Sequence, residues 1–164
     1  RQQCRPGPDL RLLVLGDYEP SSTTLLLELL ESATAGLSQS IVITLRTHPN
    51  HPVDSSEFPC LELKSTCVPM VEALQAADLV LGGNTTSAAT ESFALGCRTV
   101  VALDPCGLNF SPLRSVVGVD FVASDVELRT ILETCETGVA TPQSTSSSFH
   151  LDEQLQRWRQ LLSL

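Results

Sequence analysis

The segment most able to do chemistry is residues 82–91, GGNTTSAATE, in which two glycines lead into a run of hydroxyl-bearing residues. An apolar stretch precedes the glycines, so the pattern predicts a strand, a turn and the beginning of a helix. The N-terminus of a helix presents backbone N–H groups and a partial positive charge, and both favour a bound phosphate. The side chains of Asn84, Thr85, Thr86 and Ser87 add hydrogen-bonding groups, so the segment is a candidate phosphate site.

Glu91 extends this candidate site. It follows Ser87 by four residues, which places its carboxylate about one helical turn deeper on the same face. A carboxylate there can accept hydrogen bonds from the two hydroxyls of a ribose. The same letters also fit an ordinary helix start with Asn84 or Thr85 as the N-cap, and they match neither the dinucleotide glycine motif nor the P-loop. This segment alone leaves both interpretations open.

A second candidate is residues 46–49, Arg-Thr-His-Pro, which follow a predicted strand. Arg46 can pair with a phosphate through two N–H groups, and His48 can donate to a leaving phosphate oxygen. Pro49 fixes the turn and therefore the direction of His48. The alternative for His48 is an ordinary surface histidine in a turn, which is the interpretation that we keep for His51.

Two further segments follow predicted strands, at residues 16–18 and 104–110. Gly16 would let a ligand approach the backbone closely. Asp17 and Glu19 flank a turn, and we expect both carboxylates to be solvated. No serine–histidine–aspartate or cysteine–histidine arrangement can be argued from the spacing, so no catalytic residue is assigned.

The elements that must position these segments alternate along the chain. Apolar and β-branched runs predict strands at residues 10–15, 41–45, 60–63, 78–81, 98–103 and 120–123. Predicted helices lie between them: one capped by Ser21, Ser22 or Thr23 and ending near Gly36, and others at residues 69–77, 86–95 and 125–135. This alternation predicts an α/β, Rossmann-like open parallel sheet with helices on both faces. Ligands of such sheets bind outside the carboxyl ends of the strands.

The 164 residues divide by composition into four parts, which are a tail at 1–9, the Rossmann-like domain at 10–137, a Ser/Thr-rich linker at 138–150 and an amphipathic helix at 151–164. The last helix packs either on this domain or on another domain of a longer protein. Residue 1 is Arg, so we expect the chain to be a piece of such a protein.

Composition excludes several classes of function. The net charge is −9 and no basic run is present, which disfavours nucleic acid and acidic membranes as partners. No apolar run approaches the roughly 20 residues that span a bilayer. The six cysteines form no C-x-x-C pair and have no histidine at ligand spacing, so we predict no metal, no cofactor and reduced cysteines that pack.

Three stretches taken in order resemble the C-terminal domain of GT-B glycosyltransferases: RTHP, then AADLVLGG, then NTTSAATESFALGCRTVV. The resemblance covers about residues 10–135 and is closest to bacterial surface-polysaccharide transferases, including sialyltransferase-like and capsule enzymes. In those enzymes a His-Pro motif and a Ser/Thr-rich motif contact the nucleotide of the donor. The resemblance assigns these contacts to His48 with Pro49 and to Thr85, Thr86 and Ser87.

The resemblance implies the donor-binding domain of a cytoplasmic glycosyltransferase of surface carbohydrate biosynthesis, whose substrate is a CMP- or UDP-linked sugar. It places the acceptor site and the catalytic base in an N-terminal domain outside this chain, so this piece alone is expected to be inactive. It leaves open a peripheral association of the longer protein with a membrane.

Two alternatives remain. One is a GT-B domain like the sugar-nucleotide 2-epimerases, whose His-Pro-Asn loop resembles residues 48–50 but whose acidic-Ser-Gly-Gly segment is not matched. The other is a Rossmann-like assembly or regulatory module that binds no nucleotide, because a shared fold does not imply a shared function.

Overall fold

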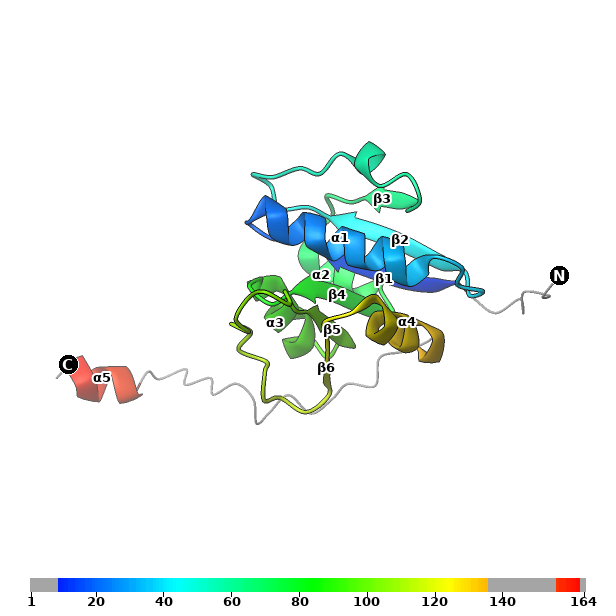
Figure 1. Ribbon diagram of the computed structural model, residues 1–164. Coiled ribbons are helices and arrows are strands. Elements are labelled where there is room, and N and C mark those ends of the chain that lie inside the picture. The colour runs from blue at the N-terminus through cyan, green and yellow to red at the C-terminus, as the bar shows by residue number, and fades with distance from the viewer. Residues whose placement is uncertain (1–8, 136–155, 163–164) are drawn as a thin grey trace.

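The computed structural model describes residues 9–135 and 156–162, and its centre is a sheet of six strands (Figure 1). The strands have the order β3-β2-β1-β4-β5-β6, and every neighbouring pair is parallel. Their bounds are β1 (Leu10–Leu15), β2 (Ile41–Arg46), β3 (Leu63–Ser65), β4 (Leu79–Gly83), β5 (Thr99–Ala102) and β6 (Val119–Val122). The prediction of a Rossmann-like open parallel sheet is confirmed.

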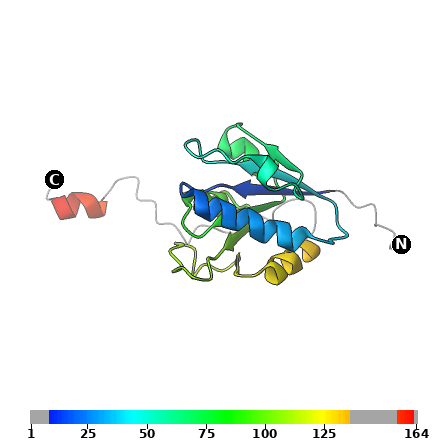
Figure 2. The same ribbon diagram turned by 45° about the horizontal axis from the view of Figure 1, so that its top comes forward.

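Helices cover both faces of this sheet (Figures 1 and 2). Helices α1 (Pro20–Thr34) and α4 (Asp125–Thr134) lie side by side on one face, and α2 (Met70–Gln75) and α3 (Ser87–Ala94) lie on the other. A short 3-10 helix, η1 (Ser55–Glu57), lies in the connection between β2 and β3. Among the described residues no helix is long and apolar enough to cross a membrane.

Strand β1 explains why the core forms around the middle of the sheet. Leu10, Leu12 and Val14 pack with the residues of α1 and α4, whereas Leu13 and Leu15 pack with those of α2. A central strand that is covered on both faces needs apolar side chains in both directions. The nearly continuous apolar run of β1 is therefore a consequence of its position.

The first helix begins earlier than the sequence pattern indicates. Its N-cap is Glu19 and its first residue is Pro20, so the predicted caps at Ser21, Ser22 or Thr23 were wrong. Proline suits the first helical position because its fixed φ is already helical and its missing N–H has no partner to lose. The hydroxyl of Thr23 instead accepts a hydrogen bond from the backbone N–H of Asp17, at 2.8 Å.

The terminal helix predicted at residues 151–164 is described only as α5 (Gln156–Leu162), in which Leu161 and Leu162 are exposed. The predicted linker, residues 1–8 of the predicted tail and the two ends of the predicted helix lie outside the described residues. Whether the helix packs on this domain or on another one stays a prediction.

An ion pair ties β1 to β4 near the ends at which the strands begin. The guanidinium of Arg11 donates to both carboxylate oxygens of Asp78, at 2.6 and 3.0 Å, and the backbone N–H of Arg11 donates to the same group at 2.9 Å. The side chain of Asp78 is only 4% exposed, whereas that of Arg11 is 54% exposed. The hydrogen bond and the charge of Asp78 raise the pKa of Arg11.

Replacing Asp78 tests how much this pair contributes. We expect Asp78→Asn to lower the free energy of unfolding by about 1.5–3 kcal/mol, because the side chain loses its charge and the amide NH2 cannot accept a hydrogen bond from Arg11 at this buried position. Asp120→Asn is the matched control, because Asp120 lies 3.8 Å from Arg98 in an exposed pair that should contribute at most about 1 kcal/mol. Urea denaturation of both variants gives the comparison, and equal losses would contradict the assignment.

Candidate functional site

The segments singled out from the sequence do emerge together. Because all six strands are parallel, the loops that follow β1, β2, β4 and β5 lie at one edge of the sheet, which we call the carboxyl edge. The chain leaves β1 through α1 towards β2, whereas α2 and α3 cross the opposite face to β4 and β5. Connections diverge in this way beside β1 and β4, at the place where open α/β sheets bind ligands.

Asp17 is buried at this edge, with 6% exposure, so the expectation that it is solvated was wrong; Glu19 is exposed as expected. The hydroxyl of Thr85 donates to Asp17 Oδ2 at 2.5 Å, and the backbone N–H of Glu19 donates to Oδ1 at 3.2 Å. Gly83 lies beside the carboxylate, and a Cβ there would be in ordinary van der Waals contact with Oδ2, at 3.4 Å. These donors replace the water that a buried carboxylate loses.

Gly16 is explained by the packing of the chain itself. Its N–H donates to the carbonyl of Arg46 at 2.8 Å. A Cβ at Gly16 would lie 3.1 Å from the Cα of Thr47 and 3.3 Å from the backbone nitrogen of His48. The loop after β2 therefore makes a close approach to Gly16, and the contact of Gly16 with a ligand stays a prediction.

His48 belongs to a small group of rings at the carboxyl edge, which we call the ring cluster: Tyr18, His48 and His51. The tyrosine ring stands edge-on to both imidazoles, with centroid distances of 5.2 Å to His48 and 5.3 Å to His51. The backbone N–H of Asn50 donates to Nδ1 of His48 at 3.3 Å, so the neutral ring carries its proton on Nε2. His48 can therefore donate a hydrogen bond outward without being charged.

Sequence reasoning assigned no role to Tyr18 and left His51 as an ordinary surface histidine. Tyr18 is 65% exposed, and His51 is half-buried and paired through the backbone with His48. The signal that links them is the parallel pairing of β1 with β2, which carries residues 18 and 48 to neighbouring loops.

Arg46 is the last residue of β2 and makes a separate contact. Its Nη1 donates to the backbone carbonyl of Val68, in the segment just before α2. His48 packs instead on Tyr18, in the loop after β1. The two side chains that the sequence grouped together thus lie at the end of β2 and in the loop after it, and they are held by different neighbours.

The turn between β4 and α3 is held by three of its own side chains. Asn84 Nδ2 donates to the carbonyl of Leu108 at 2.9 Å, and Thr85 donates to Asp17. Thr86 caps α3 by accepting from the N–H of Ala88 at 3.3 Å, so the cap lies one or two residues later than predicted. The exposed hydroxyl of Ser87 makes no hydrogen bond within the described residues.

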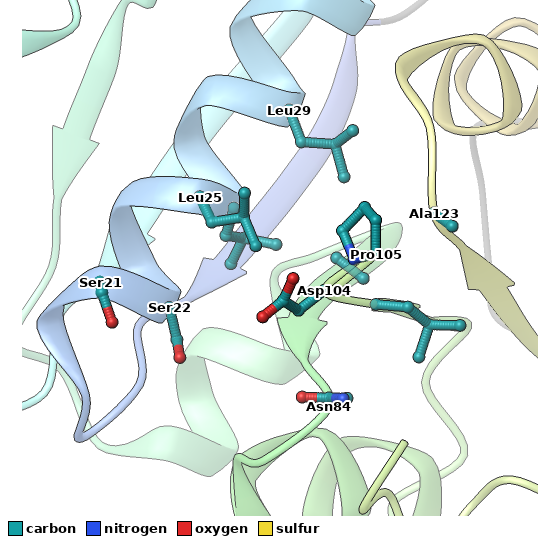
Figure 3. Close-up of a pocket in the computed structure, with 11 residues that line it drawn as sticks. Ser21, Ser22, Leu25, Leu29, Asn84, Asp104, Pro105 and Ala123 are labelled. Carbon is teal, nitrogen blue, oxygen red and sulfur yellow. The ribbon is translucent and has the colours of Figure 1, made fainter. Parts of the chain in front are cut away.

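A cavity of about 320 Å³ opens beside this turn, between α1 and the segment that follows β5 (Figure 3). Its polar lining comes from Ser21, Ser22, Asn84 and Asp104. Its apolar lining comes from Leu25, Leu26, Leu29, Leu103 and Pro105. Of the site residues predicted from the sequence, only Asn84 lines this cavity.

Asp104 is an exposed residue of the cavity wall, and one of its oxygens accepts a hydrogen bond from the backbone. Its Oδ1 accepts the backbone N–H of Cys106 at 2.8 Å, and its carboxylate is directed towards α1 (Figure 3). The rule that ligands bind after parallel strands points to the segment at 104–110, but Ser21 and Ser22 were assigned only to helix capping. Their place in the wall follows from the packing of α1.

The described residues contain no group of three or more histidine, cysteine or acidic side chains that could hold a metal ion. Burial raises the pKa of the Cys97 and Cys135 thiols, which disfavours the thiolate form that binds metals or attacks substrates. These two cysteines are packing residues.

Removing the Asp17 carboxylate tests its structural role. We expect Asp17→Ala to lower the free energy of unfolding by about 1.5–3 kcal/mol, because Thr85 and the Glu19 N–H lose a charged acceptor. Glu19→Ala is the nearby control, since the exposed Glu19 side chain makes one surface contact with Ser21 and should change stability by at most about 0.5 kcal/mol. Thermal and urea unfolding measure both, and a neutral Asp17→Ala would contradict the assignment.

Comparison with known proteins supports the fold. Searches with protein-family models and among curated protein sequences find no match. Among solved structures, the chain is similar to the one described as the "Glycotransferase of kitacinnamycin", with 20% sequence identity and a TM-score of 0.55. The alignment covers 81% of this chain but only 36% of that one. At this identity the likeness shows a shared fold, so this α/β sheet is of a kind that occurs in a glycosyltransferase.

Proposed function

We propose that the chain is the donor-binding domain of a glycosyltransferase and that it binds a nucleotide-activated sugar at the carboxyl edge. The observation that carries the proposal is the turn between β4 and α3. Asn84, Thr85 and Thr86 hold the turn in place, while the hydroxyl of Ser87 stays exposed at the first turn of α3. A rigid turn that leaves a helix start and a hydroxyl exposed suits the binding of a phosphate.

The neighbouring groups suit the rest of a nucleotide. Glu91 is exposed one helical turn beyond Ser87, where its carboxylate could accept the hydroxyls of a ribose. The Nε2–H of His48 could donate to a phosphate oxygen, and Tyr18 offers an exposed ring beside it. Arg46 keeps further N–H groups besides the one bound to Val68. In this proposal His48, Ser87 and Glu91 contact one ligand.

The wider role rests on the order of the motifs. The RTHP and Ser/Thr-rich segments resemble those of bacterial surface-polysaccharide transferases, so we assign the longer protein to surface carbohydrate biosynthesis in the cytoplasm. An N-terminal domain would supply the acceptor site and the catalytic base. The donor would be a CMP- or UDP-linked sugar.

Two variants test the site by nucleotide affinity. We expect His48→Ala and Ser87→Ala each to weaken binding by about tenfold or more, because a charge-assisted contact to phosphate contributes roughly 1.5–3 kcal/mol. Titration of the full chain with CMP, UDP, GDP and their sugars, followed by NMR or calorimetry, first identifies the nucleotide. Each variant is then titrated with it.

Ser32→Ala is the control for these variants, because Ser32 is exposed near the end of α1, away from the carboxyl edge. It should leave the affinity unchanged, and the melting temperature of all three variants should stay close to that of the wild type. Unchanged affinity in both His48→Ala and Ser87→Ala would contradict the proposed site. Failure of every nucleotide to bind would favour an assembly or regulatory module.

The second expectation concerns activity. Residues 1–164 should bind a nucleotide sugar but should not transfer or hydrolyse it, because the acceptor site and the base are proposed to lie in another domain. The measurement is the release of nucleotide from each donor sugar over time, with and without oligosaccharide acceptors. Turnover of a donor sugar above the level of a mock purification would contradict the proposal that the acceptor site and the base lie in another domain. Product analysis with the longer protein separates a transferase from a 2-epimerase.

A further inference from the structure

We infer that the cavity beside Asp104 receives the sugar of the donor and that this sugar carries no charge. The inference rests on the proposed donor-binding function and adds the chemical class of the substrate. It is carried by three observations, which are the position of the cavity relative to α3, the chemistry of its walls and the sign of its charge.

The direction of α3 indicates which part of the donor would reach the cavity. The proposed contacts run backwards along the chain, from the ribose at Glu91 to the phosphate at Ser87. Asn84 precedes the helix and lines the cavity. The group that is bonded to the phosphates on the side away from the ribose is the sugar, so the sugar reaches the cavity. At about 320 Å³ the cavity is near the lower end of the roughly 300–1,000 Å³ of ligand pockets, which suits one ring.

The walls of the cavity suit a ring with hydroxyl groups. The carboxylate of Asp104 is held by the N–H of Cys106 and is directed towards α1 across the cavity (Figure 3). It keeps lone pairs that accept hydrogen bonds from sugar hydroxyls. The hydroxyls of Ser21 and Ser22 lie on the opposite wall, and leucine side chains of α1 offer an apolar surface for the C–H groups of the ring.

The charge of the cavity selects against an acidic sugar. Asp104 is the one charged side chain among the described residues that line it, and no arginine, lysine or histidine is among them. A carboxylate on the sugar would lie near a like charge with no cation to compensate it, which is unfavourable. The cavity therefore fits a neutral hexose better than a uronic acid or a sialic acid.

Matched donor pairs test this inference. The full chain is titrated with UDP, UDP-glucose and UDP-glucuronate, and in parallel with GDP, GDP-mannose and GDP-mannuronate. Within each pair the sugars differ only at C6, which is an alcohol in one and a carboxylate in the other. For the nucleotide that binds, we expect the neutral sugar to bind at least about tenfold tighter than the acidic one. If CMP is that nucleotide, CMP-sialic acid should bind no tighter than CMP.

Asp104→Asn shows whether the carboxylate causes the preference for the neutral sugar. Asparagine has nearly the same shape as aspartate and keeps an oxygen that can accept the N–H of Cys106. We expect the preference for the neutral sugar to fall to about threefold or less in this variant. Glu62→Gln removes the same charge from an exposed residue near β3, at the other end of the sheet, and should keep the full preference.

The possible results separate this inference from the proposed function. Nucleotide binding with equal affinity for the neutral and acidic sugars, or tighter binding of CMP-sialic acid than of CMP, would overturn the inference and leave the donor-binding function standing. A preference that survives Asp104→Asn would overturn it as well. Failure of all the nucleotides to bind would overturn both.

Discussion

The carboxylate of Asp17 joins the ends of three elements that meet at the carboxyl edge. It follows β1, accepts the hydroxyl of Thr85 from the turn before α3, and accepts the backbone N–H of Glu19 at the start of α1. The backbone N–H of Asp17 donates to the hydroxyl of Thr23 within α1. Because the same turn positions Ser87 and Asn84, the placement of the candidate phosphate site and of one cavity wall depends on this buried group.

The order of the strands divides the carboxyl edge into two halves, one on either side of Asp17. The loops after β1 and β2 carry the ring cluster of Tyr18, His48 and His51, and the segments after β4 and β5 carry the α3 start and the cavity with Asp104. Gly16 lets the loops after β1 and β2 approach each other within the first half, since a side chain there would press on the loop after β2. Across the two halves, a Cβ at Gly83 would make an ordinary contact with the carboxylate of Asp17.

The sequence was most informative where burial determines residue type. The apolar run of β1 follows from its cover on both faces, and the position of that strand could be predicted from it. Strand β3 lies at Leu63–Ser65, not at 60–63, because a short edge strand with only one partner leaves little apolar signal. The burial of Asp17 depends on β1 lying next to β4, and alternation of strands and helices does not specify which strands become neighbours. For the same reason, the sequence did not predict that Ser21 and Ser22 line the cavity.

A net charge of −9 is at first sight a poor match for an anionic ligand. The arrangement at the carboxyl edge shows how the two can be reconciled. Along α3 and into the cavity, the groups alternate between an acceptor at Glu91, the N–H groups and hydroxyl at the start of α3, and an acceptor at Asp104. A nucleotide sugar has the complementary order, with hydroxyl donors on the ribose and on the sugar and the charged acceptors on the phosphates between them. Backbone N–H groups can hold a phosphate without a cluster of cations, so an acidic domain can bind such a donor, provided that its carboxylates face hydroxyls.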